Sequence, residues 1–145
     1  MKANGNGHAL LGPDEGEVIE ARGSRVVVKV ATAGQLVCEY GAPAHFAGPP
    51  LHVHPGFDET FIVIEGRVEV RVRDRRAELA AGATAHVSGH VPHTFRNPGA
   101  ERARFLLICT PGGFEHFFRG MAAGDQEAIA AISERFGYRP VESAR

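Results

Sequence analysis

The chain has 145 residues, 16 of them Lys or Arg and 17 Asp or Glu, which gives a formal net charge of −1 at pH 7. This length suits one domain around a single core, and the balanced charge excludes the strong positive field that attracts nucleic acid or an anionic membrane. With two cysteines, no signal-peptide pattern and no membrane-length apolar run, we expect a cytoplasmic protein with no nucleic-acid or membrane partner.

The first part of the chain predicts a β-rich domain after a short leader. Residues 1–16 are rich in Gly and Asn and lack periodicity, which predicts a flexible lead-in. Residues 17–111 form short β-rich runs separated by Gly and Pro, at a spacing typical of a sandwich or barrel. Glu65-Gly66-Arg67 is a tight connection between two runs and predicts a hairpin. The predicted strands span 17–22, 25–32, 35–40, 51–54, 60–65, 67–73, 83–87, 93–97 and 102–110.

Residues 112–137 change to a helical pattern. Apolar side chains recur there at the spacing of one helix face, and Asp125 is placed to cap a second helix. We expect the two helices to cover the open end of a barrel or to join a dimer contact, and residues 138–145 to form a tail. The apolar positions are Phe114, Phe117, Phe118 and Met121 in the first helix, and Ile129, Ile132 and Phe136 in the second.

Histidines are clustered in the middle of the chain. The chain has eight His, six of them between residues 45 and 93, and imidazole is the commonest metal ligand in proteins. His52 and His54 are two residues apart, so on a strand they project from the same face. Glu59 comes just before the next predicted strand, in phase with Phe61 and Val63 on it, and the three side chains predict a facial set of metal ligands. His93 supplies a further imidazole from a strand distant in sequence.

Two motifs resemble those of the cupin family. His52-x-His54-x4-Glu59-x6-Gly66 matches the first motif, although Phe46 stands where that motif begins with Gly. Residues 67–81 separate it from the second motif, the short spacing of compact cupins. The second motif is matched in register by Gly82, His93 and Asn97, with Ser88 and His90 in place of its Pro and Gly. The chain therefore resembles a small bacterial single-domain cupin, and it is most similar to the quercetin-dioxygenase-like branch.

The resemblance implies an all-β fold, a cupin jelly-roll β-barrel with a short C-terminal helical extension. It also implies one divalent transition metal ion (Fe, Mn, Ni, Cu or Zn) at the barrel mouth, held by His52, His54, Glu59 and His93. Asp58 is the alternative carboxylate, but a Glu reaches farther and the spacing to Gly66 favours Glu59. In the contrasting interpretation these side chains line the barrel mouth without a metal.

For function, the resemblance favours a metal-dependent dioxygenase-type oxidoreductase that acts on a small aromatic, flavonoid-like or enolic substrate. Glu59 then also acts as a catalytic base, and Phe61, Val63, His86 and Phe95 line the substrate pocket, although His86 fits a core position equally well. A homodimer is expected. The alternatives are a non-redox isomerase or polyketide-cyclase-like enzyme, and a non-catalytic module that binds a metal or small ligand.

Overall fold

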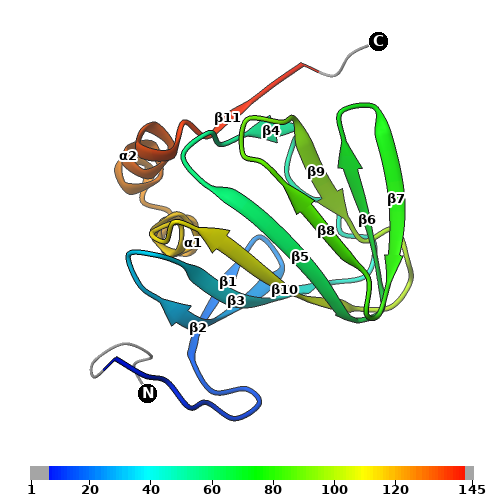
Figure 1. Cartoon of the computed structure of the whole chain (residues 1–145), viewed down its shortest axis with the longest axis horizontal. Coiled ribbons are helices and arrows are strands. Elements are labelled where there is room, and N and C mark those ends of the chain that lie inside the picture. The colour runs from blue at the N-terminus through cyan, green and yellow to red at the C-terminus, as the bar shows by residue number, and fades with distance from the viewer. Residues whose placement is uncertain (1–6, 143–145) are drawn as a thin grey trace.

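The computed structural model describes residues 7–142, which fold into two antiparallel sheets followed by two helices (Figure 1). One sheet has the strand order β1-β2-β3-β10-β5-β8 and the other the order β11-β4-β9-β6-β7. The predicted all-β fold with a short helical extension is confirmed. The strands are β1 (Glu17–Ala21), β2 (Ser24–Ala31), β3 (Leu36–Ala42), β4 (His52–Val53), β5 (Asp58–Glu65), β6 (Arg67–Val72), β7 (Arg75–Ala80), β8 (Thr84–Val87), β9 (His93–Arg96), β10 (Ala103–Thr110) and β11 (Arg139–Pro140).

Alternation of side chains along the strands builds the core between the two sheets. In β10, Ala103, Phe105, Leu107 and Cys109 are buried and the residues between them are more exposed. Successive residues of a strand point to opposite faces, so these four side chains enter the space between the sheets. Val68 and Val70 do the same from β6, while the charged residues of that strand face outward. The interior is thus a closed apolar core.

The predicted hairpin at Gly66 is wrong. β5 pairs with β10 and β8, whereas β6 pairs with β7 and β9 in the other sheet. Gly66 therefore lies at a corner between the sheets, with φ of 77°, in the left-handed region that glycine adopts without strain. The hairpin is formed instead by β6 and β7, a strand that the sequence did not predict because its exposed residues show no apolar alternation.

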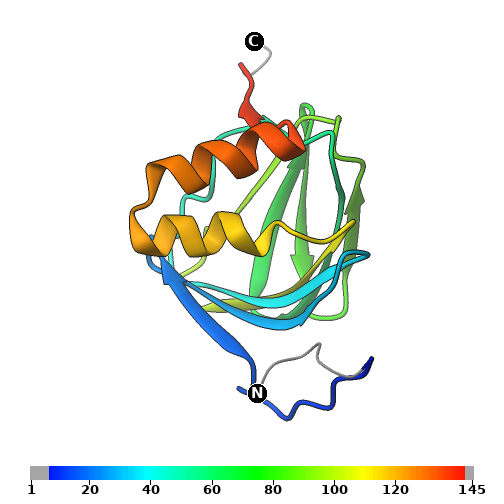
Figure 2. The same ribbon diagram turned by 90° about the vertical axis from the view of Figure 1, so that its left-hand side faces the viewer.

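Two helices follow the last long strand. These are α1 (Glu115–Ala123) and α2 (Gln126–Phe136), which lie side by side against one flank of the barrel (Figure 2). Asp125 caps α2 as predicted, because its carboxylate accepts a hydrogen bond from the Ala128 N–H at 3.1 Å. Phe114, Phe118 and Phe136 are buried where the helices meet the barrel. No helix within residues 7–142 is long and apolar enough to cross a membrane.

The two predicted end segments lie partly within the described residues. Residues 1–6 and 143–145 lie outside the described residues. In the rest of the lead-in, the Lys29 ammonium donates hydrogen bonds to the carbonyl oxygens of Gly12 and Glu15, at 3.1 and 2.7 Å. In the predicted tail, β11 pairs with β4 (Figure 1). This pairing was missed because a two-residue strand carries no periodicity.

Candidate metal centre

Strands from both sheets bring the four predicted metal ligands together. His52 lies on β4 and pairs directly with His93 on β9, while Glu59 enters from β5. His54 follows β4, where its backbone N–H donates to the Gly89 carbonyl at 2.7 Å. One ligand atom from each of the four lies within 4.8 Å of the other three, and all four side chains are buried. The structure therefore forms the constellation that the spacing predicted.

Backbone hydrogen bonds fix the orientation of all three imidazoles. The Nδ1 atoms of His52, His54 and His93 lie 2.7, 2.9 and 2.7 Å from the carbonyl oxygens of residues 50, 57 and 91, in that order. A carbonyl oxygen only accepts, so each Nδ1 carries the hydrogen and donates it. Each ring then turns its Nε2 atom toward the common centre. This arrangement is typical of histidines that bind metals, whose other nitrogen is held by a carbonyl or carboxylate.

The inward-facing atoms form a tight group of electron-pair donors. The Nε2 atoms of His54 and His93 lie 2.9 Å apart, and Glu59 Oε1 lies 3.4 Å from the first and 3.0 Å from the second. With their hydrogens on Nδ1, two neutral imidazoles would direct lone pairs at each other and at a carboxylate. Such an arrangement is repulsive in a buried site unless a cation, either a proton or a metal ion, lies among the donors.

Without a metal, a proton stabilises this group. Burial lowers the pKa of His54, but the hydrogen bond and charge of Glu59 outweigh burial, so the pKa is raised. Burial raises the pKa of Glu59, yet hydrogen bonds with His54 and His93 and their charges lower it to about 2. Burial, followed by the charge of His93, lowers the pKa of His52 to about 4. The free site therefore contains an ionised Glu59, a neutral His52 and a His54 that readily holds a proton.

The departures from the second motif are explained by the loop before β9. A Cβ atom on Gly89 would lie 2.0 Å from the Phe57 carbonyl oxygen and 2.1 Å from that of His54, so this position requires glycine. Asp58, the alternative ligand, instead accepts a hydrogen bond from the Gly89 N–H at 3.0 Å. His90 is exposed beside Ser88. The backbone of this loop therefore passes close to the carbonyls of His54 and Phe57 at Gly89 rather than at residue 90. The exposed His90 does not face the ligands.

Of the predicted pocket residues, the structure places two next to the ligands. Phe61 follows Glu59 on the inner face of β5, and Phe95 follows His93 on β9; their ring centroids lie 5.6 Å apart in the core. Val63 lies one step farther from the ligands on β5. His86 is exposed on the outer face, with Nδ1 2.9 Å from the Thr60 hydroxyl. Phe61 and Phe95 thus form the floor of the site, and the pocket role predicted for His86 is corrected.

The sequence did not identify the aromatic side chains that cover the ligands. The Phe57 ring stacks on His54 with centroids 3.8 Å apart, and Phe114 and Phe136 pack against Phe57 at 4.7 and 5.2 Å. The ring centroid of Tyr138 lies 4.9 Å from that of His52. The Phe residues of the helices were visible as a helical stripe, but no pattern related them to the histidines. Tyr138 stood in the predicted tail, without any signal.

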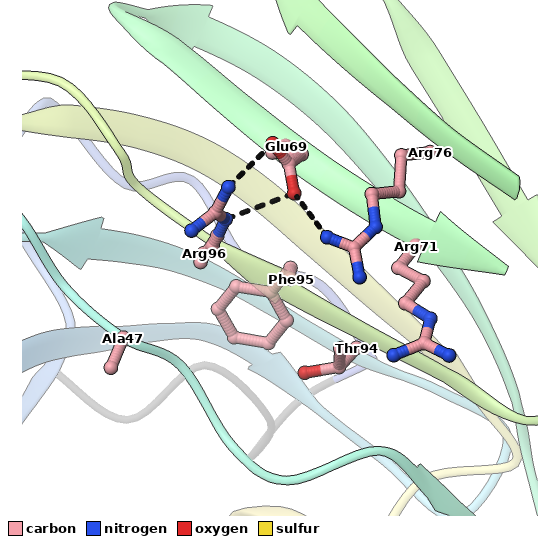
Figure 3. Close-up of a pocket in the computed structure, with 7 residues that line it drawn as sticks. All are labelled: Ala47, Glu69, Arg71, Arg76, Thr94, Phe95 and Arg96. Atoms are coloured by element: carbon pink, nitrogen blue, oxygen red, sulfur yellow. Dashed lines mark hydrogen bonds and ion pairs between the residues drawn. The ribbon is translucent and has the colours of Figure 1, made fainter. Parts of the chain in front are cut away.

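A surface hollow of about 160 Å³ lies elsewhere, on the outer side of β6 and β9 (Figure 3). Its lining contains none of the four ligands. Glu69 lies at one side, where the Arg96 guanidinium donates to both carboxylate oxygens at 2.9 and 3.0 Å and Arg76 lies 3.7 Å away. These ion pairs hold the pKa of Glu69 below its usual range, first through the Arg96 hydrogen bonds. The hollow is thus lined mainly by charged side chains on the solvent-facing side of these strands.

Comparison with known proteins agrees with this architecture. The family model for the cupin domain matches residues 42–109. An uncharacterized protein from Archaeoglobus fulgidus is 31% identical over 87 residues, which cover 54% of this chain and 76% of that protein. The solved structure of an RmlC-like cupin from Shewanella frigidimarina superposes with a TM-score of 0.64 at 18% identity, over 72% of this chain and 92% of that one. The chain belongs to the cupin family.

One relative has a named activity. A quercetin 2,3-dioxygenase from Bacillus subtilis is 29% identical over 69 residues, which are 48% of this chain. The matched region is only 20% of the length of that dioxygenase. This chain therefore corresponds to only part of that longer protein.

Proposed function

We propose that the protein binds one divalent transition metal ion through His52, His54, Glu59 and His93, and uses it for dioxygenase-type oxidation of a small aromatic, flavonoid-like or enolic substrate. One observation carries the metal proposal. Three imidazoles, each held by a backbone carbonyl at Nδ1, direct Nε2 to the buried point that Glu59 also reaches. Three nitrogens and one carboxylate oxygen suit Fe, Mn, Ni, Cu or Zn, and they leave coordination positions for a ligand on a six-coordinate ion.

The chemistry that such an ion supplies is polarisation of a bound substrate oxygen and, for a redox-active metal, electron exchange with dioxygen. The protein's own residues hold and shield the site. The three Nδ1–H donors keep the imidazoles in one tautomer, and Phe61 and Phe95 exclude water from below. Dioxygenase-type chemistry on an enolate or catecholate takes its electrons from the substrate and places both oxygen atoms in products, so no external reductant is required.

Glu59 acts first as the anionic ligand in this proposal. A carboxyl group with a pKa of about 2 holds a proton weakly, and general bases work best when their pKa lies near the working pH. The role of Glu59 as catalytic base therefore requires that its hydrogen bonds with His54 and His93 be replaced when the site is filled. The support from relatives is the named quercetin 2,3-dioxygenase, which is 29% identical to this chain over 69 residues.

Burial of the site favours one alternative, a cupin that holds a metal without turnover. His54 and His93 are 1% and 0% exposed, and His52 and Glu59 are 5% and 6% exposed. A substrate as large as a flavonol must therefore find a route to the metal, whereas a metal-holding module needs none. Turnover separates the two functions.

The test combines metal analysis with an oxygen-consumption screen. Purified protein should contain or take up about one equivalent of a transition metal. Protein loaded with Fe, Mn, Ni or Cu should consume oxygen with a flavonol, a catechol or a 1,3-diketone, and the His93→Ala variant treated identically should not. Metal binding without oxygen consumption would contradict the dioxygenase proposal and favour the metal-holding alternative. Turnover without oxygen would favour an isomerase. Failure to bind any metal would overturn the metal centre itself.

A further inference from the structure

The residues after α2 pair with the strand that carries the first metal ligand. β11 pairs with β4, placing Arg139 opposite Val53 and Pro140 opposite His52, and the Val141 N–H donates to the Leu51 carbonyl at 2.9 Å. Figure 1 shows this strand beside β4, at the end of the barrel that carries the ligands. We call residues 137–142 the strap. The strap is thus a neighbour of the strand that supplies the first metal ligand.

Tyr138 is the side chain of the strap that covers the site. Its ring centroid lies 4.9 Å from that of His52, 5.0 Å from that of Phe117 and 6.0 Å from that of Phe114. The Tyr138 side chain is half-buried, whereas His52 beneath it is only 5% exposed. Tyr138 therefore stands between this imidazole and solvent.

The chain is held firmly before the strap. Phe136 is 3% exposed, and its carbonyl accepts a hydrogen bond from the Gly56 N–H at 2.8 Å. A Cβ atom on Gly56 would lie 2.7 Å from the Phe136 Cα, so the end of α2 is packed backbone against backbone on the turn between His54 and Phe57. This close packing anchors α2 and the ligand-bearing turn to each other.

At the start of the strap the Tyr138 N–H donates to the Ser133 carbonyl at 2.8 Å, a bond that must break when the strap opens, and beyond it the strap is held more weakly. Gly137 has φ of 68° and ends α2, which makes it a natural pivot. Beyond Gly137, the residues of β11 are exposed, and Pro140 has no N–H to donate to the ladder. Short edge elements with exposed backbone hydrogen bonds open at low free energy. The contrast between Phe136 and β11 places a hinge at Gly137.

We propose that the strap is a gate over the metal centre, and that Tyr138 controls which ligands reach the metal and forms the wall against which a bound ligand lies. The proposal rests on the proposed function only in requiring a ligand that enters the site. Entry requires the strap to swing about Gly137 so that Tyr138 leaves His52. The aromatic surface of Tyr138, with Phe117 and Phe114 behind it, suits a planar, aromatic or enolic ligand. Tyr138 is thus a specificity-determining residue.

The first test uses the metal-free protein and measures exposure of His52. Diethyl pyrocarbonate acylates accessible imidazoles, and mass spectrometry of peptides gives a rate for each histidine. Tyr138→Ala should raise the rate at His52 by about tenfold, the scale set by loss of such ring contacts, while Tyr138→Phe stays near the wild-type rate because its ring still covers the site. His90, which is exposed, serves as the internal reference. Equal rates at His52 in all three proteins would overturn the proposal.

A second variant tests the same gate without removing Tyr138. The β11–β4 register continues to place Val141 opposite Leu51, and opposed residues of antiparallel strands have Cα atoms about 4.5–5.5 Å apart, within reach of a disulfide. The double variant Leu51→Cys/Val141→Cys should protect His52 when oxidised and lose that protection when reduced. Cys38 and Cys109 are buried and stay out of the exchange. Identical rates in the oxidised and reduced forms would refute a moving strap.

The third measurement relates the gate to the metal. Azide binding to the Co(II)-loaded protein, followed by visible absorption, should be faster in Tyr138→Ala and slower in the oxidised double variant. Protein that binds Co(II) but shows the same azide rate in every variant overturns the gate and leaves the metal proposal standing. Protein that binds no metal overturns the proposed function, and the acylation rates of His52 then decide the gate alone.

Discussion

Metal binding by this protein should depend on pH through one histidine in particular. In the metal-free site the pKa of His54 is raised by its interaction with Glu59, whereas the pKa of His52 is lowered to about 4 and that of Glu59 to about 2. Below the ordinary pKa of a histidine and above about pH 5, the proton of His54 therefore occupies a place among the donors, while His52 is neutral and Glu59 is ionised. A metal ion must displace that proton to bind.

The expected magnitude follows from linkage. Below the pKa of His54, displacement of one proton lowers the apparent metal affinity by about tenfold, or about 1.4 kcal/mol, for each unit of decreasing pH. Above that pKa the proton has already left, so the affinity levels off. Protonation of His52 adds a second proton only near its pKa of about 4. Stronger binding is thus expected at higher pH.

Competition with a chromophoric chelator at several pH values measures the slope, and calorimetry in buffers of different ionisation enthalpy counts the protons released. NMR of the imidazole Cε1–H of His54 in the metal-free protein gives its pKa directly. In Glu59→Gln the hydrogen bond and charge that raise this pKa are lost, so it should fall. An affinity that is constant from pH 5 to 8, or a His54 pKa unaffected by Glu59→Gln, would refute the reasoning.

Three further predictions concern binding and stability. His52→Ala should weaken metal binding by more than roughly 10–100-fold, which is the loss seen when a residue that only supports a ligand is changed. Circular dichroism should show an intact fold. An unfolded variant would instead assign His52 to the core. Asn97→Ala should lower the free energy of unfolding in urea by about 3 kcal/mol, because its amide donates to the carbonyls of residues 42, 43 and 101, and its metal affinity should match wild type. Gly89→Ala should lower the free energy of unfolding by about 3 kcal/mol or more, because the new Cβ would meet two carbonyl oxygens. Gly34→Ala serves as the control, since the atom nearest to its new Cβ is 3.9 Å away. Equal melting temperatures of the two variants would contradict the packing at Gly89.

Several expectations about the whole protein stay predictions. These are a homodimer, a cytoplasmic location, and the absence of nucleic-acid and membrane partners. Sedimentation of the purified chain measures the first, and the exposed Val18 and Ile64 on β1 and β5 are the large apolar side chains in the described strands that a dimer contact would be expected to cover.

The sequence by itself determined the barrel and the donor set. Alternation in runs such as Arg67–Arg73 reports which side chains face a core, because the period of a strand is fixed by its geometry. His52, His54 and Glu59 belong to one short segment of the chain, so a sequence pattern is enough to identify these three donors. His93 was found because a second motif accompanied it.

Only the tertiary structure decided how the donors are held and covered. The tautomers depend on where the carbonyls of residues 50, 57 and 91 point, and the raised pKa of His54 depends on burial beside Glu59. The corner at Gly66 and the strap with Tyr138 arise from pairings between distant strands, for which short segments carry no signal. Periodicity reports which way a side chain faces along its own strand, but contacts across the fold depend on how whole sheets close on one another.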